Sequence, residues 1–242
     1  MHHAPSRAAW LLMAALPAAA AAATAAPVQI TEFKLPNTSS GPAGIAPGPD
    51  GNLWFTELFE NKIGRISTAG AVTGEFAVPG GSVVTEYPAG IAAGPDGNLW
   101  FTELTVNLVG RITTAGVVTQ FSVPTANADP ADIARGPDGN FWFTEAGANK
   151  IGRITPAGAI KEFPLPAGGM RPLGIAAGPD GNLWFTVSGS AAIGRVSPQG
   201  AFQQYLLPDA GADPQPAAIA AGPDGNLWFT ELTVNLVGRI TT

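Results

Sequence analysis

The tetrapeptide Gly-Pro-Asp-Gly recurs five times in this chain of 242 residues, and this repetition constrains the fold more than any other feature. The copies lie 42 to 46 residues apart. Each leads into Asn-(Leu/Phe)-Trp-Phe-Thr and then (Ile/Val)-Gly-Arg-(Ile/Val), and four repeats continue into a segment that ends in Pro. A period of this length is typical of architectures in which each repeat is one supersecondary unit. The five aspartates are Asp50, Asp96, Asp138, Asp180 and Asp224.

A complete repeat is predicted to contain four strands. A small apolar run such as residues 90–93 comes first, and Pro-Asp-Gly then makes a tight turn, because Pro fixes φ and Gly accepts positive φ. The second strand carries apolar residues on both faces, with Leu99 and Phe101 on one and Trp100 on the other, which favours a sheet buried on both sides. Four short strands per repeat, sandwiched between like neighbours, are typical of a β-propeller blade.

The last repeat contains only three of the four strands, while residues 28–36 (VQITEFKLP) match the fourth strand of the other repeats. The sequence therefore predicts an all-β fold: a β-propeller of five four-stranded blades, with the ring closed by the N-terminal strand pairing with the last blade. Closure would remove an exposed sheet edge. A truncated product and a part of a larger ring remain alternatives. The repeats fall around residues 28–79, 80–124, 125–166, 167–208 and 209–242.

The N-terminus resembles a secretory signal peptide. Arg7 is followed by the apolar residues 8–16 and by the A-x-A-like site Ala23-Thr24-Ala25. We therefore expect a signal peptide at residues 1–25, a single propeller domain at 26–242, and a secreted or extracytoplasmic protein that does not associate with membranes after cleavage. An uncleaved anchor is the alternative. Both histidines, His2 and His3, lie in the leader, so the mature protein would contain none.

Composition excludes several classes of function. The chain has no cysteine, which rules out disulfides, thiol chemistry and Cys-ligated zinc. The formal charge of −6 argues against nucleic-acid binding, which needs Lys and Arg to neutralise phosphates. An acidic surface favours cations or neutral ligands instead. We expect a monomer that binds a small molecule or a peptide-like ligand.

The repeats GPDGNLWFTE, NKIGRIT, EFPLP and GIAAG resemble those of the virginiamycin B lyase (streptogramin lyase) family, over nearly all of residues 28–242. The resemblance implies a reaction in which a histidine removes a proton and the ester C–O bond of a cyclic depsipeptide breaks by elimination. It also implies a magnesium ion held by two glutamates. Relatives usually form seven-bladed propellers, and five repeats depart from that pattern.

The resemblance places the histidine directly after the Pro that precedes the first strand of a blade. None of the residues at this position in the present chain can accept a proton: Ala43, Ala89, Ala131, Leu173 and Ala217. Of the five repeats, only the third retains carboxylates at both implied metal-ligand positions, Asp129 and Glu145, with Asp132 nearby. Oxygen ligands suit Mg²⁺ or Ca²⁺, so these two residues are the candidate metal ligands.

A rim of loops at one end of the blades is the candidate ligand-binding face, since loops on a rigid scaffold commonly carry recognition. Its candidate residues are Glu57, Glu103, Glu231, Tyr87 and Arg171. The alternative for the glutamates is a purely structural role in an exposed ion pair across a hairpin, Glu57 with Lys62 and Glu145 with Lys150. Such a pair stabilises the fold by about 0.2–1 kcal/mol. Glu103 and Glu231 face leucines and would be freer to bind. Solvated loops without a ligand remain the alternative for the whole face.

The recurring Trp and Arg pairs are interpreted as structural. Trp54 lies opposite Arg65 in the predicted hairpin, and the same pair recurs in each repeat. Cross-strand packing and cation–π contact explain such repetition better than ligand binding does. The Asp of Pro-Asp-Gly is interpreted as a turn residue that bonds neighbouring backbone N–H groups.

Three hypotheses of function follow. The first is a secreted β-propeller that binds a ligand or partner and lacks the general-base histidine of the family that it resembles. The second is a metal-dependent C–O lyase that linearises streptogramin B-type cyclic depsipeptides with a carboxylate as base, since burial or like charge can raise a carboxyl pKa. The third is a purely structural repeat module.

Overall fold

The computed structural model describes residues 29–80, 87–166, 168–208, 211 and 213–242. The chain divides into two units, Met1–Glu32 and Phe33–Thr242. Of the first unit, only residues 29–32 are described, and they form neither strand nor helix. The expected signal peptide therefore lies outside the described residues. Within the described part of the chain, no helix is long and apolar enough to cross a membrane.

The second unit consists of five antiparallel sheets that follow one another along the chain, and we call them blades 1 to 5. Blades 1 and 2 comprise β1 (Pro42–Pro47), β2 (Leu53–Glu57), β3 (Lys62–Ile66) and β4 (Val72–Ala77), then β5 (Pro88–Ala93), β6 (Asn98–Glu103), β7 (Leu108–Thr113) and β8 (Val118–Ser122). Blades 3 and 4 comprise β9 (Pro130–Arg135), β10 (Phe141–Glu145), β11 (Lys150–Ile154) and β12 (Ile160–Pro164), then β13 (Pro172–Ala177), β14 (Leu183–Val187), β15 (Ala192–Val196) and β16 (Phe202–Leu206). Blade 5 comprises β17 (Pro216–Ala221), β18 (Leu227–Glu231) and β19 (Leu236–Ile240). Short 3-10 turns follow β2 and β14, at Leu58–Glu60 and Ser188–Ser190.

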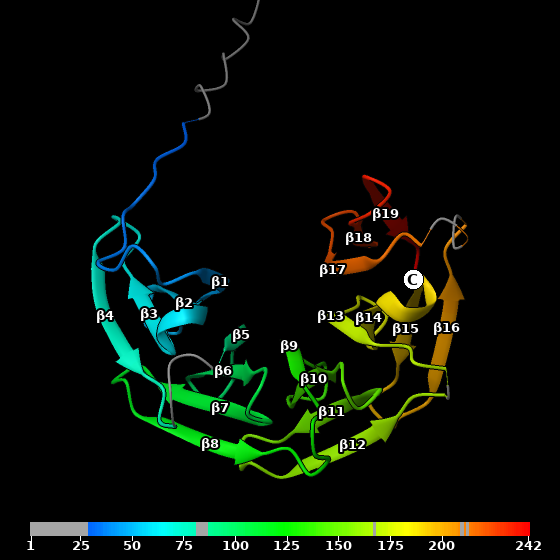
Figure 1. Ribbon diagram of the computed structural model, residues 1–242, viewed down its shortest axis with the longest axis horizontal. Coiled ribbons are helices and arrows are strands. Elements are labelled where there is room, and N and C mark those ends of the chain that lie inside the picture. The colour runs from blue at the N-terminus through cyan, green and yellow to red at the C-terminus, as the bar shows by residue number, and fades with distance from the viewer. Residues whose placement is uncertain (1–28, 81–86, 167, 209–210, 212) are drawn as a thin grey trace, which may run out of the picture. The chain divides into compact units, whose positions relative to one another are not determined.

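The first strands of successive blades pack side by side, β1 on β5, β5 on β9, β9 on β13 and β13 on β17. They lie innermost in the second unit, with the fourth strands β4, β8, β12 and β16 outermost (Figure 1). The innermost strands are rich in Gly and Ala, which allows this close approach. The prediction of an all-β propeller with five blades is confirmed.

The predicted ring closure is not formed by the described residues. Blade 5 has three strands, and residues 29–36 contain no strand. Phe33 instead contacts blade 1, where a Cβ added at Gly70 would collide with its ring. The fourth strands of blades 1 to 3 make the same contact with the blade that follows, through Phe76 on Gly116, Phe121 on Gly158 and Phe163 on Gly200. The match between residues 28–36 and the fourth strands therefore reflects how such a segment packs on the blade that follows it. It did not show which blade the segment would pair with as a strand.

Each repeat is held by one Asp, Trp and Arg cluster. In all five blades the Trp indole N–H donates to the Asp of Gly-Pro-Asp-Gly at 3.0–3.1 Å. The Arg guanidinium lies 5.4–5.6 Å from the same Trp ring. The Asp also accepts the N–H of the Asn two residues on, as in Asn52 to Asp50. Both structural interpretations are confirmed, and the sequence had not indicated the indole hydrogen bond.

A threonine in the second strand connects each of blades 1 to 4 to the next. Its hydroxyl accepts a backbone N–H of its own blade and donates to a carbonyl of the following first strand, as Thr102 does to Ala131 at 3.1 Å. The four accepting carbonyls belong to Ala89, Ala131, Leu173 and Ala217. These are four of the five residues at the implied histidine position, so the scaffold fixes their backbone while their side chains stay available.

Candidate functional site

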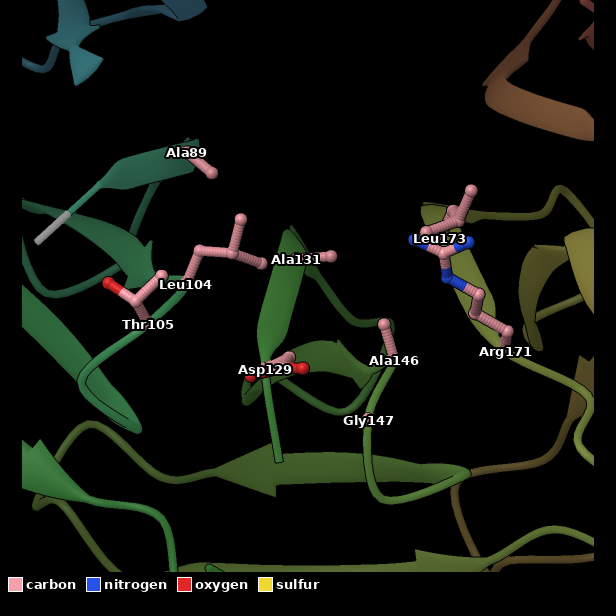
Figure 2. A pocket seen from close by; sticks show the side chains of 9 residues that line it. All are labelled: Ala89, Leu104, Thr105, Asp129, Ala131, Ala146, Gly147, Arg171 and Leu173. Carbon is pink, nitrogen blue, oxygen red and sulfur yellow. The ribbon is translucent and has the colours of Figure 1, made fainter. Parts of the chain in front are cut away.

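A cavity of about 390 Å³ lies among blades 2, 3 and 4. The starts of the first strands of all three blades line it, together with the loops between the second and third strands of blades 2 and 3. Figure 2 shows residues of blade 2 on one side, residues of blade 4 on the other, and residues of blade 3 between them. The lining consists of Ala89, Leu104, Thr105, Asp129, Ala131, Ala146, Gly147, Arg171 and Leu173.

The walls of this cavity contain three residues that stand at the implied histidine position, Ala89, Ala131 and Leu173. Each is half-buried and carries only a methyl or isobutyl group. Proton abstraction requires a titratable group within hydrogen-bond reach of the proton, and these side chains supply none. The cavity therefore occupies the place where the resemblance implies a base, but its wall there is apolar.

Asp129 and Arg171 supply opposite charges at this cavity. They hold the same position in neighbouring blades, directly before the Pro that begins β9 and β13, and both are exposed. Each has a φ of 47°, a conformation uncommon for residues other than glycine. Gln215 has the same conformation at this position in blade 5, with a φ of 46°. The turn geometry therefore belongs to the scaffold, and the side chains on it vary.

The candidate metal ligands Asp129 and Glu145 lie in different surroundings. Asp129 lines the cavity, whereas Glu145 ends β10, is fully buried and is absent from the lining. Neither carboxylate oxygen of Glu145 has a hydrogen-bond partner. Burial raises the pKa of Glu145 to about 8, the negative charge of Glu162 adds to the rise, and Lys150 offsets only part of it. Among the described residues no group of three or more His, Cys, Asp or Glu could hold a metal ion, so the metal site stays a prediction.

Glu57 and Glu145, at the ends of β2 and β10, do not form the exposed ion pairs that were the structural alternative to ligand binding. The register does place Glu57 opposite Lys62 and Glu145 opposite Lys150. Both glutamates are nonetheless 0% exposed. Lys150 pairs with Glu162 at 2.9 Å, and Lys62 pairs with Glu60 and Glu75. The neighbouring fourth strand supplies Glu162 and Glu75, and hairpin register alone could not indicate this competition.

Glu103 and Glu231 also differ from the expectation that they are freer to bind. Glu103 is fully buried and accepts the side-chain N–H₂ of Gln120 at 3.0 and 2.9 Å. Glu231 is 8% exposed and also interacts with another part of the protein. All three rim glutamates, Glu57 included, thus lie inside the blades, and their role in ligand binding stays a prediction.

Of the other rim residues, Tyr87 lies outside the cavity lining. It is half-buried, and its ring meets Phe59 edge-on with centroids 6.3 Å apart. Arg171 lines the cavity, as described above.

Asp132 has a structural role that the sequence did not indicate. Blades 1, 2 and 4 carry glycine at this position, Gly44, Gly90 and Gly174. The Asp132 carboxylate accepts the N–H of Ile133 at 2.8 Å and that of Ile175, in blade 4, at 3.0 Å. Burial nevertheless raises its pKa. A departure from glycine in one repeat was the available signal.

Repeated four-stranded blades with a loop-lined cavity beside their innermost strands define the class of this protein, a β-propeller with a candidate binding site near its centre. The virginiamycin B lyase family model matches residues 3–242, and the chain belongs to this family.

Solved structures agree with this assignment. Virginiamycin B lyase from Staphylococcus aureus shares 39% identity with a TM-score of 0.83, over 88% of this chain and 71% of that chain. A catalytically inactive form of that lyase, solved with quinupristin, gives the same values. A streptogramin B lyase structure shares 33% identity with a TM-score of 0.64, over 88% of this chain and 83% of that chain.

A curated relative, virginiamycin B lyase from Saccharopolyspora erythraea, is 46% identical over 46 residues. That alignment covers 19% of this chain and only 15% of the relative, which is about one repeat.

Proposed function

We propose that this protein is a secreted, ligand-binding β-propeller of the virginiamycin B lyase family that lacks the family's general-base histidine. The observation that carries the proposal is the wall of the 390 Å³ cavity, where Ala89, Ala131 and Leu173 hold the histidine position. The volume falls within the range of about 300–1,000 Å³ typical of small-molecule pockets. Binding without turnover follows, because a cavity persists where the proton acceptor is missing.

The ligand that best fits this cavity is peptide-like, with apolar side chains and no large net charge. The apolar wall would take the side chains, while Arg171 and Asp129 offer one cation and one carboxylate for the carbonyl and N–H groups of a peptide. Quinupristin, which accompanies the inactive lyase from Staphylococcus aureus, is a suitable probe.

The repeat supplies a matched control for the test. Ala131→Trp would fill the cavity, whereas Ala217→Trp places the same bulk at the same position of blade 5, away from the cavity lining. We expect calorimetry to show quinupristin binding to the wild type and to Ala217→Trp, with at least about a tenfold loss of affinity for Ala131→Trp. No binding to the wild type, or binding that Ala131→Trp leaves unchanged, would contradict the proposal.

Turnover is measured on the same samples. Elimination adds no water, so a linearised product would have the mass of the substrate, and it is separated by chromatography rather than by mass alone. We expect the cyclic compound to be recovered intact. Linear product that disappears in Asp129→Ala or Glu145→Ala would establish the lyase instead.

The metal-dependent lyase is the second candidate, and the buried Glu145 favours it. A cation could partner the two carboxylate oxygens that lack hydrogen bonds. Bound Mg²⁺ or Ca²⁺ would supply positive charge that stabilises negative charge developing on a substrate, with Asp129 and Glu145 as its protein ligands. Because the carboxylate must be ionised to bind, Mg²⁺ affinity should rise with pH through about 8. Absence of Mg²⁺ and Ca²⁺ binding above that pH would exclude this candidate.

Secretion has its own test. Expression of the full chain in a bacterial host should release a mature protein into the periplasm or medium. Mass spectrometry of that protein should show that residues 1–25 have been removed, and an intact N-terminus would refute the proposed signal peptide.

A further inference from the structure

Asp129 and Arg171 are the two charged residues that line the 390 Å³ cavity. Within the residues that the structure describes, neither side chain forms an ion pair or a hydrogen bond. By contrast, the arginines of the Trp clusters pair with the turn aspartates in four of the five blades. The cavity therefore presents one negative and one positive charge that are available to a ligand.

The backbone that carries Asp129 is held from two sides. The side-chain N–H₂ of Asn107 donates to two carbonyls of the preceding segment at 2.8 Å, and its oxygen accepts the N–H of Ala128 at 2.9 Å. From blade 3, Ala146 donates its N–H to the Asp129 carbonyl at 3.1 Å. The carboxylate itself lies against Gly147, where an added Cβ would collide with it. The position of this negative charge is thus set by the scaffold before any ligand arrives.

The backbone that carries Arg171 is held in the same way. Asn149 is the counterpart of Asn107 in blade 3. Its side chain donates to the Pro166 carbonyl at 3.0 Å and accepts the N–H of Met170 at 3.0 Å. Ser188 of blade 4 donates its N–H to the Arg171 carbonyl at 3.2 Å. Because both backbone positions are fixed in advance, a ligand that uses the two charges orders only their side chains when it binds.

We propose that the cavity binds short linear peptides whose two ends are free, with Arg171 holding the terminal carboxylate and Asp129 the terminal ammonium group. This inference rests on the proposed function, because it uses the same cavity. A guanidinium offers a carboxylate two parallel N–H donors, and both ends of a peptide are ionised near about pH 6. The two charged side chains stand apart in Figure 2, with Ala146 between them, as the ends of an extended peptide do.

The rest of the lining agrees with such a ligand. Leu104, Ala131 and Leu173 supply an apolar wall for the side chains of the peptide. A peptide with two ionised ends carries no net charge, so the single positive and single negative charge of the cavity match it. A cyclic peptide has neither end, and it meets Asp129 and Arg171 only through neutral N–H and carbonyl groups.

Blocking the ends of the peptide one at a time tests the assignment. Calorimetry at about pH 6 with Ala-Leu, Ala-Leu-Ala and Ala-Leu-Leu-Ala identifies the length that binds most tightly. That peptide is then compared with its N-acetylated and its C-amidated form. We expect each blocked form to bind about threefold to tenfold more weakly, because each loses one ion pair with a partly exposed side chain.

Two substitutions assign each end to its residue. Arg171→Gln should weaken binding of the free peptide by as much as C-amidation does, and it should leave the affinity of the amide unchanged. Asp129→Asn should behave in the same way toward N-acetylation. Arg135→Gln is the control, because it removes the same charge from an exposed residue of β9 outside the cavity lining, and it should change none of these affinities. Thermal unfolding confirms that all three variants are folded.

Equal affinities for the free and the blocked peptides would overturn this inference. So would a loss of affinity in Arg171→Gln or Asp129→Asn that is the same for free and blocked forms. Quinupristin separates the inference from the proposed function. If quinupristin binds and Ala131→Trp weakens it, while free ends give a peptide no advantage, the inference fails and the proposed function stands. If neither quinupristin nor any of the peptides binds, both fail.

Discussion

Glu145 gives the sharpest test of how the stability of the second unit depends on pH. It ends β10, it is 0% exposed, and neither of its carboxylate oxygens is hydrogen-bonded. Burial, with the added charge of Glu162, raises its pKa from 4.5 to about 8. Glu145→Gln keeps the shape of the side chain but removes the proton equilibrium.

The sign of the effect follows from proton binding. Between pH 4.5 and about 8 the unfolded chain has released this proton while the folded chain still holds it. Folding then takes up a proton, so the free energy of unfolding falls as pH rises through this window, and it is constant in this respect above it. A shift of roughly 3.5 pKa units corresponds to at most about 5 kcal/mol, at about 1.36 kcal/mol per unit.

The assay is urea-induced unfolding of wild type and Glu145→Gln at several values between about pH 5 and pH 9. The quantity to follow is the difference between the two proteins, because burial also raises the pKa of Asp132 and Glu57 in both. We expect the variant to gain stability relative to wild type as pH rises, by a few kcal/mol at about pH 9. Glu103→Gln is the matched control. Gln120 already donates to the Glu103 carboxylate, so removing that carboxylate should not increase the free energy of unfolding.

A pH-independent difference between Glu145→Gln and wild type would refute this reasoning. It would mean that the carboxylate ionises in the folded state near its ordinary pKa. If added Mg²⁺ stabilises wild type at about pH 9 but leaves Glu145→Gln unchanged, the ionised carboxylate has found a cation. That result would favour the metal-dependent candidate.

Blade 4 and blade 5 allow three further comparisons by urea unfolding. Trp184→Ala should cost about 3–5 kcal/mol, and Trp228→Ala clearly less, because Trp184 is 1% exposed and Trp228 39%; equal losses would contradict the burial difference. Asp180→Ala should cost about 1–3 kcal/mol, because it leaves the buried indole N–H of Trp184 without its acceptor at 3.0 Å; a neutral result would show that water replaces it. Thr186→Val should cost about 1–3 kcal/mol, because it removes the donor to the Ala217 carbonyl and the acceptor of the Gly174 N–H, and an unchanged midpoint would exclude these contacts as stabilising ones.

The repeat itself made most of the fold predictable. The Pro-Asp-Gly turns, the strand register that opposes Trp54 to Arg65, and the two-sided burial of the second strand all follow from local chemistry that each repeat restates. Ring closure was not predictable in the same way, because it depends on which blade Phe33 contacts. A segment with the sequence of a fourth strand carries no signal that tells which sheet it joins.

The candidate site was less accessible to sequence reasoning because its residues interact across blades. Pairing Glu145 with Lys150 across the hairpin was a correct statement about register. It failed as a statement about energetics, because Lys150 donates to Glu162 and Thr125 instead, and Glu145 stays buried without a hydrogen-bond partner. The partners come from a fourth strand and from the preceding loop, at sequence separations where a repeat pattern gives no guidance.

The same structure shows how the side chain at the implied histidine position can vary without loss of the fold. At the implied histidine position the scaffold uses only the backbone carbonyl, which accepts the threonine hydroxyl of the preceding blade in four of the five repeats. The side chain makes no contribution to that bond, and in blades 2, 3 and 4 it lines the cavity. Ala89, Ala131 and Leu173 therefore preserve what the interface between blades requires. By contrast, the Asp, Trp and Arg of each blade support the sheet directly, and all five repeats retain them. Selection on folding alone would keep the cluster and leave the cavity free to change its chemistry.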